Sequence, residues 1–171
     1  MSGLPRDFRF ETERLRVEAV PDVGHPSRLS FEVAGILSPE VTAFLPPNLQ
    51  VPPVGIDGAA WLATATADAT VLAARDEHGA LIGLVLLHPG GSEIMFGYLL
   101  AQHAWGRGYG TELVRGLATA LSTASACDRL VGGVDPANAA SIRVLEKAGF
   151  VRRPGQGPGG SLFYACALND G

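Results

Sequence analysis

Residues 105–110, Trp-Gly-Arg-Gly-Tyr-Gly, constrain the fold and ligands of this chain more than any other stretch. The apolar run at 94–100 is typical of a strand, and from Thr111 onward apolar residues recur at the spacing of an amphipathic helix. The glycines therefore lie at a strand-to-helix turn. Amides at a helix N-terminus attract phosphate groups, and glycine lacks the Cβ that would hold a phosphate off. The stretch predicts a phosphate-bearing ligand, with Arg107 adding positive charge.

Two common phosphate-binding motifs do not fit this stretch. A P-loop ends in Gly-Lys-Ser/Thr, and no such ending follows Gly110. A dinucleotide fingerprint beginning at Gly106 would need glycine or alanine at Thr111. One beginning at Gly108 would need glycine or alanine at Leu113. Both nucleotide motifs are excluded.

The stretch instead resembles the acyl-CoA pyrophosphate loop of the GNAT acetyltransferases, Gln/Arg-x-x-Gly-x-Gly/Ala at the start of a helix. Trp105 stands where that family often has Gln or Arg. The Trp-Gly-x-Gly-Tyr variant is similar to the branch that acetylates the N-termini of ribosomal proteins. On these six residues alone, a glycine-rich turn without a ligand stays open as the alternative.

A second motif occupies residues 138–150, which begin Asn-Ala-Ala-Ser and end Glu-Lys-Ala-Gly-Phe. The pattern is typical of a helix that Asn138 caps and Gly149 ends. It resembles the GNAT segment that packs along the pantetheine arm of the cofactor. A strand at 129–134 separates the two motifs, and this order is also that of the family.

Length and composition favour one domain, residues 1–171, with a sizeable core, because 47% of the residues are hydrophobic. Thirteen basic and seventeen acidic residues give a net charge of −4, which argues against nucleic acid or an anionic membrane as partner. Isolated Cys127 and Cys166, with no apolar leader or membrane span, indicate a cytoplasmic protein. The histidines show no metal-ligand spacing, so we expect no metal.

The remaining elements agree with the same family, and the resemblance extends over residues 11–168. Glu-Thr-Glu-Arg-Leu before the first strand is similar to the ribosomal-protein branch. The implied fold is α/β (α+β): a mixed, twisted sheet of about six to seven strands, flanked by about four helices, with the fourth and fifth strands splayed around acetyl-CoA. The patterns predict strands at 15–19, 70–74, 80–87, 94–100, 129–134, 150–152 and 162–168. They predict helices at 29–45, with an interruption at Pro39, and at 58–67, 111–121 and 138–148.

The resemblance also implies how acetyl-CoA is held. Backbone groups of the fourth strand would pair with the pantetheine amides, and the glycine-rich loop would hold the pyrophosphate. The expected acetyl-CoA contacts are Leu99, Leu100, Trp105, Gly106, Arg107, Gly108, Tyr109, Gly110, Thr111 and Asn138.

Two catalytic candidates follow from the implied attack of an amine on the thioester. The tyrosine that protonates the leaving thiolate in many relatives is replaced here by Leu145, and Ser141 matches the serine proposed in the ribosomal-protein branch. That branch often has an acidic base where this chain has Met95. The nearest carboxylate is Glu93, about 6.6 Å along an unbulged strand, so it would act through water.

The resemblance implies an N-acetyltransferase whose acceptor is a primary amine, with a protein or peptide N-terminal α-amine favoured. A small amine, such as a polyamine or an aminoglycoside, is the alternative acceptor. A non-catalytic acyl-CoA sensor stays open as well, because the usual tyrosine acid is absent at Leu145. The sequence defines no oligomeric state, and a homodimer stays open.

Overall fold

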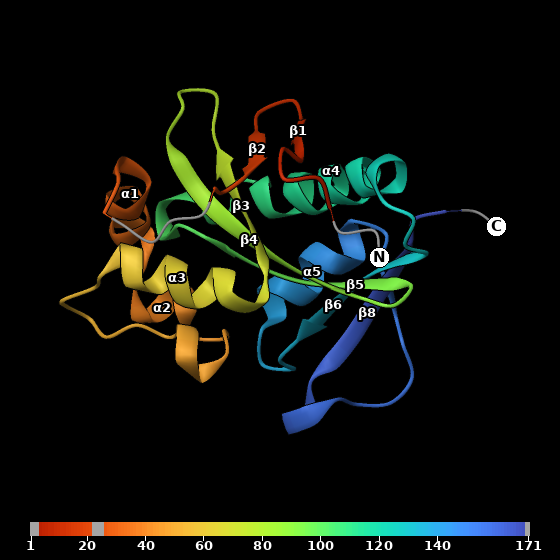
Figure 1. Cartoon of the computed structure of the whole chain (residues 1–171). Helices are drawn as coiled ribbons and strands as arrows, with labels where there is room; N and C mark the ends of the chain where they lie inside the picture. Colours follow the sequence, from red (N-terminus) through yellow and green to blue (C-terminus); the bar gives the residue numbers. More distant parts are fainter. Residues whose placement is uncertain (1–3, 22–25, 170–171) are drawn as a thin grey trace.

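The computed structural model describes residues 4–21 and 26–169 (Figure 1). The strands are β1 (Arg9–Glu11), β2 (Arg16–Ala19), β3 (Thr70–Arg75), β4 (Leu81–Gly90), β5 (Glu93–Leu100), β6 (Arg129–Val134), β7 (Val151–Arg152) and β8 (Leu162–Ala167). The α-helices are α1 (Arg28–Ile36), α2 (Pro39–Thr42), α3 (Gly58–Asp68), α4 (Tyr109–Ala124) and α5 (Ala139–Lys147). Three short 3-10 helices are η1 (Pro47–Leu49), η2 (Gln102–Ala104) and η3 (Pro158–Gly160).

The strands form one sheet in the order β1-β2-β3-β4-β5-β6-β8-β7. Neighbouring strands are antiparallel except for β5 and β6, which are parallel. Helices α4 and α5 pack in one core cluster and helices α1 and α3 in another, so the sheet is covered on both faces (Figure 1). The chain can place β6 parallel to β5 because α4 lies between them as a crossover.

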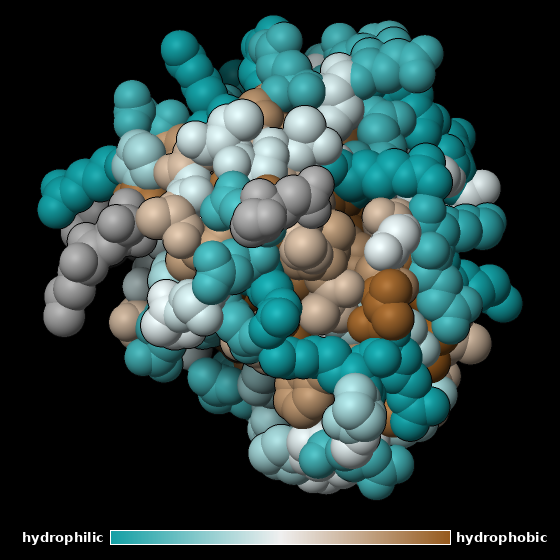
Figure 2. Space-filling view, turned by 90° about the vertical axis from the view of Figure 1, so that its right-hand side faces the viewer, coloured by the Kyte–Doolittle hydropathy of each residue, from teal (hydrophilic) through white to brown (hydrophobic). Residues whose placement is uncertain are grey.

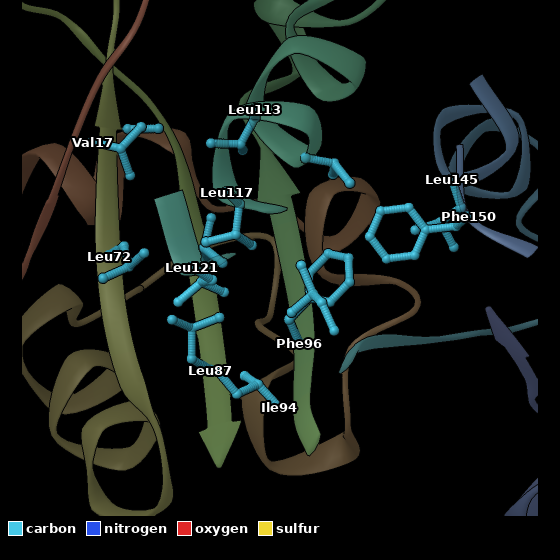
Figure 3. Packing of buried hydrophobic residues seen from close by; sticks show 14 of the residues in the cluster. Val17, Leu72, Leu87, Ile94, Phe96, Leu113, Leu117, Leu121, Leu145 and Phe150 are labelled. Atoms are coloured by element: carbon cyan, nitrogen blue, oxygen red, sulfur yellow. The ribbon is translucent and has the colours of Figure 1, made fainter. Parts of the chain in front are cut away.

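The larger core lies between the sheet and helix α4. Leu113, Leu117 and Leu121 recur every four residues on α4 and are fully buried (Figure 3). They pack in one cluster with Leu87 and Ile94 of the sheet. Burying each such side chain stabilises the fold by about 1.5–3 kcal/mol, so this contact fixes the position of α4 on the sheet.

The structure confirms the expected class of fold and corrects three details. The described residues form eight strands rather than six or seven, because β1 pairs with β2 although its three residues show no alternating pattern. They form five α-helices rather than about four. Helix α4 begins at Tyr109, two residues before the predicted start, because Gly108 adopts a positive φ of 80° as its N-cap.

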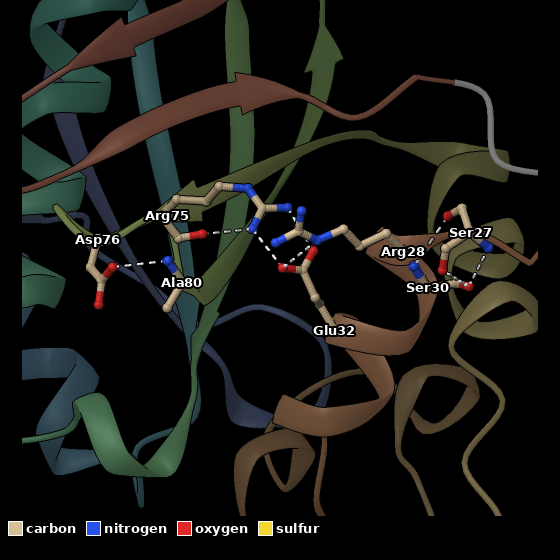
Figure 4. Close-up of polar contacts among 8 residues, drawn as sticks. Ser27, Arg28, Ser30, Glu32, Arg75, Asp76 and Ala80 are labelled. Carbon is tan, nitrogen blue, oxygen red and sulfur yellow. Dashed lines mark hydrogen bonds and ion pairs between the residues drawn. The ribbon is translucent and has the colours of Figure 1, made fainter.

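Helix α1 is fixed to the sheet by a partly buried ion pair (Figure 4). Ser27 and Ser30 form a reciprocal cap at its N-terminus. One turn further on, Glu32 accepts two hydrogen bonds from Arg75 of β3, at 2.7 and 2.9 Å. The Arg75 hydrogen bonds lower the pKa of Glu32 below its ordinary value of 4.5. The pair therefore favours the charged carboxylate in the folded state.

Large apolar side chains are also found on the surface. Phe31, Phe44, Val54, Trp105 and Val151 are exposed. Figure 2, which views the right-hand side of Figure 1, shows hydrophilic residues framing a smaller apolar area. Single exposed apolar residues are ordinary in folded proteins, so these positions need a further observation before they carry a function. Only Trp105 adjoins the glycine-rich loop.

We expect Glu32→Gln to lower the free energy of unfolding by about 1–3 kcal/mol, since it removes a charge-assisted, two-bond contact. Because the pKa of Glu32 is lowered on folding, this stabilisation is present above the unfolded pKa and is lost as the pH falls through the folded value. Urea unfolding at pH 7 and at pH 3 tests this. The control is Glu11→Gln, since the Glu11–Arg16 pair is about 70% exposed on both sides and should change stability by at most about 1 kcal/mol. Equal effects of the two substitutions would contradict the anchoring role.

Candidate active site

The central feature of the site is an opening between β5 and β6. The two strands pair only from Glu93↔Arg129 to Phe96↔Gly132. Beyond this point β5 continues along β4 as far as Leu100, and β6 continues along β8 as far as Val134. The facing edges of the two strands then have no partner strand in the described residues. This confirms the splayed strands expected from the sequence.

The register of β5 determines which backbone groups face the opening. Ala101 N donates to Ile82 O at 2.7 Å, and opposite residues of an antiparallel pair alternate between bonded and non-bonded positions. Counting back from Ala101, Leu99 directs its N–H and C=O toward β4. Tyr98 and Leu100 direct theirs toward the opening. The expectation for Leu99 is therefore corrected, because its backbone groups belong to the β4 ladder, and Tyr98 takes its place.

Trp105 closes one end of this edge. Its indole Nε1 donates to Leu100 O at 2.9 Å, although 47% of the residue is exposed. The bond satisfies the last outward carbonyl of β5 and leaves Leu100 N–H facing the opening. Trp105 therefore positions the start of the glycine-rich loop against the strand that it follows.

The glycine-rich loop presents a set of free amides. Gly106 and Gly108 have φ angles of 72° and 80°, a conformation that favours glycine. Glu112 N makes the first helical bond of α4, to Gly108 O at 3.1 Å, and α4 has no side-chain cap. The amides from Gly108 to Thr111 thus precede the first helical hydrogen bond. A pyrophosphate fits this arrangement because it supplies the missing acceptors at the positive end of the helix dipole.

An arginine from the β1–β2 turn holds the loop from outside. Glu112 accepts hydrogen bonds from Thr12 Oγ1 and from both Arg14 N and Arg14 Nε. Arg14 also donates to Arg107 O at 3.0 Å and lies 4.2 Å above the Tyr109 ring. Burial raises the pKa of Glu112, but the bonds from Thr12 and Arg14 outweigh it and lower the pKa overall. This contact fixes the turn from loop to helix.

Helix α5 brings Ser141 to the same opening. Asn138 caps the helix by accepting from Ser141 N at 3.2 Å. The Ser141 hydroxyl lies 3.1 Å from the Tyr98 hydroxyl, and either can donate. Burial raises the pKa of Tyr98 above 10.0, and the bond with Ser141 offsets part of this rise. The phenol is therefore protonated at neutral pH.

Leu145, at the usual tyrosine position, is 2% exposed and packs toward Gly132 in the core. It offers no hydroxyl to the opening. Helices α4 and α5 approach closely at Gly110, where an added Cβ would lie 3.1 Å from Val144. Within α5, Ser141 is the residue that carries a hydroxyl group.

The contacts of Glu93 argue against its predicted role as a base. Arg153 donates to both of its oxygens at 2.8 and 3.1 Å, and Arg129 lies 3.6 Å away. The Arg153 hydrogen bonds lower the pKa of Glu93 and make it a weaker base. Glu93 also begins β5, where β5 and β6 are still paired, about 17 Å along the strand from Tyr98. Glu93 therefore belongs to the closed end of the sheet, and its contacts do not suit the role of a base.

Two residues of the site were missed from the sequence. Tyr98 was assigned only to a strand, although alternation with Ile94 and Phe96 places it on the α4 and α5 side. Arg14 was assigned only to a motif preceding a strand. Its contact with Glu112 joins residues 98 positions apart, so no local pattern could have shown it.

Comparisons with known proteins agree with this geometry. Residues 28–151 match the family described as the acetyltransferase (GNAT) domain. A GNAT-family acetyltransferase structure from Bacillus anthracis is 17% identical, with a TM-score of 0.76 over 94% of this chain and 99% of that one. A search of curated proteins finds no significant match.

Two further structures come from Vibrio cholerae. One, provisionally described as a ribosomal-protein-serine acetyltransferase, is 16% identical with a TM-score of 0.70 and covers 95% of this chain and 98% of its own. The other is a spermidine N-acetyltransferase in complex with CoA and spermine, 15% identical with a TM-score of 0.71, covering 92% and 97%. At these identities the structures show a shared fold and leave the acceptor open.

The match over residues 28–151 shows that the chain belongs to the GNAT acetyltransferase family. It is therefore an acetyl-CoA-dependent N-acetyltransferase. Within residues 4–21 and 26–169, no helix is long and apolar enough to cross a membrane. The same residues contain no group of three His, Cys, Asp or Glu side chains arranged to hold a metal ion.

We expect Gly108→Val to abolish acetyl-CoA binding, because the side chain would displace the pyrophosphate from the amides, whereas Arg107→Ala should weaken binding only a few-fold. Calorimetry with acetyl-CoA measures both. Gly79→Val is the matched control: Gly79 has a similar φ of 79° but lies in the β3–β4 turn with open space around it. Binding by Gly108→Val equal to that of the Gly79→Val control would contradict the loop assignment.

Proposed function

We propose that this acetyltransferase acts on the α-amino group of a peptide or protein N-terminus. Acetyl-CoA would lie in the opening between β5 and β6. Its pyrophosphate would accept from the amides of Gly108 to Thr111, and its pantetheine amides would pair with the outward N–H of Leu100 and the outward C=O of Tyr98. The outward N–H of Tyr98, which lies further along β5 from the loop, is the donor that we assign to the developing oxyanion.

The ion pairs of Glu93 are the observation that favours an α-amine as acceptor. Two arginines hold this carboxylate at the closed end of the sheet, so the base expected from the sequence is not placed to deprotonate an amine. An α-amine with a pKa near 8 is about a tenth neutral at pH 7, whereas an amine near 10.4 is under a thousandth neutral. An acceptor that supplies its own neutral form suits this site better.

Ser141 would protonate the departing thiolate. It lies in the first turn of α5 beside the opening, and Leu145 leaves the usual tyrosine position without a proton donor. A group that donates only as the C–S bond breaks stabilises the transition state more than the bound substrate. The role therefore predicts an effect on turnover rather than on binding.

We expect Ser141→Ala to lower kcat about 10- to 100-fold and to change the Kd of acetyl-CoA less than about three-fold. Release of free thiol measures kcat, and calorimetry measures Kd. Ser122→Ala is the control, since Ser122 lies near the far end of α4 and its hydroxyl bonds to Thr119 O of the same helix. If folded Ser141→Ala has unchanged turnover, Ser141 is not the proton donor and is only a structural residue of the helix.

We expect kcat/KM for an N-terminal peptide amine to rise with pH and level off near pH 8, as the amine becomes neutral. For spermidine the rise should continue toward about pH 10, and activity at pH 7 should be lower. A panel of peptides, polyamines and aminoglycosides, read by mass spectrometry, tests this. A polyamine that outperforms every peptide at pH 7 would overturn the proposed acceptor. Acetyl-CoA binding without thiol release from any amine would indicate a sensor.

A further inference from the structure

The contact between Tyr98 and Ser141 has a consequence beyond the assignment of Ser141. The two hydroxyls lie 3.1 Å apart and come from different elements, the strand that lines the opening and the helix that covers it. Tyr98 is partly buried, and Ser141 is its hydrogen-bond partner among the described side chains. The phenol is thus directed at the one hydroxyl that the proposed reaction uses.

We propose that Tyr98 is a positioning residue that supplies the proton which Ser141 delivers to the leaving thiolate. The inference rests on the proposed function of Ser141. Tyr98 lies on strand β5, whereas the usual tyrosine position, which Leu145 occupies here, lies on helix α5. The two hydroxyls would together replace the absent tyrosine.

Acidity explains why serine needs this partner. An aliphatic hydroxyl is about as weak an acid as water and is therefore far weaker than a thiol, whose pKa is about 8.5. Serine alone would have to give up its proton against this large difference in acidity. A phenol, with an ordinary pKa of about 10, is much closer to the thiol, and burial raises the pKa of Tyr98 above that ordinary value. The transfer becomes feasible when both protons move together.

The step balances without any further reactant. As the C–S bond breaks, its electron pair remains on sulfur, and Ser141 Oγ–H transfers its proton to that sulfur. Ser141 Oγ takes the proton of Tyr98 Oη in the same step. The resulting phenolate then recovers, through water, the proton that the attacking nitrogen loses when the amide forms. The net change is one proton moved from amine to thiol.

Steady-state kinetics of the full chain with its best amine acceptor test the proposal. We expect Tyr98→Phe to lower kcat about 10- to 100-fold while the Kd of acetyl-CoA and the melting temperature stay near wild type. The double variant with Ser141→Ala should be no slower than the slower single variant by more than about two-fold, because the two groups act as one unit. Tyr164→Phe is the matched control: this buried phenol bonds to Glu146 at 3.4 Å, and its kcat should stay near wild type.

Rates in mixtures of H2O and D2O separate proton supply from packing. A two-proton transfer in the wild type predicts that kcat falls along a curve as the deuterium fraction rises, and Tyr98→Phe should lose that curvature. If the wild type turns over and the kcat of Tyr98→Phe is within two-fold of the wild-type value, the relay is overturned and the proposed function stands. A double variant whose loss is the product of the single losses would overturn the relay as well. Wild-type protein that releases no thiol with any amine would overturn the proposed function and the relay with it.

Discussion

The loss of pairing between β5 and β6 is the constraint on which the rest of this structure depends. Both strands keep their outer partners, β4 and β8, while their facing edges separate after Phe96 and Gly132. Unpaired backbone groups inside a fold are costly unless something satisfies them. The sheet therefore carries an edge in its interior that suits an extended, amide-bearing ligand. In this family that ligand is the pantetheine arm.

Contacts distant in sequence keep this edge in a defined shape. Trp105 bonds to Leu100 O, the last outward carbonyl of β5, and directs the chain into the glycine-rich loop. Arg14 and Glu112 then fix the start of α4 against the β1–β2 turn. At the other end, Glu93 with its two arginines belongs to the part of the sheet where β5 and β6 remain paired. Glu93, which the sequence suggested as a base, thus forms ion pairs where β5 and β6 are still paired.

The sequence predicted what depends on local pattern. The glycine-rich turn, the helix that Asn138 caps and the strand between them are set by neighbouring residues, and the structure has each of them. The missed features depend on long-range geometry. The direction of the Leu99 backbone requires the register with β4, and the state of Glu93 requires Arg153, which lies 60 positions away. The meeting of Tyr98 with Ser141 joins a strand to a helix 43 positions further along the chain, so no local pattern could predict it.

In the proposed reaction, Tyr98 joins substrate binding to proton supply through the geometry of a single strand. Its backbone groups face the opening, where the pantetheine would pair, while its side chain stands on the face covered by α5 and meets Ser141. A shift of β5 by one residue would reverse both directions at once, because strand side chains alternate between faces. The antiparallel register with β4, intact from Gly83↔Leu100 to Gly90↔Glu93, excludes such a shift. The same hydrogen-bonded ladder that leaves the neighbouring edge unpaired therefore also fixes the phenol beside the serine, so the proposed binding site and the proposed proton relay would form together when the sheet folds.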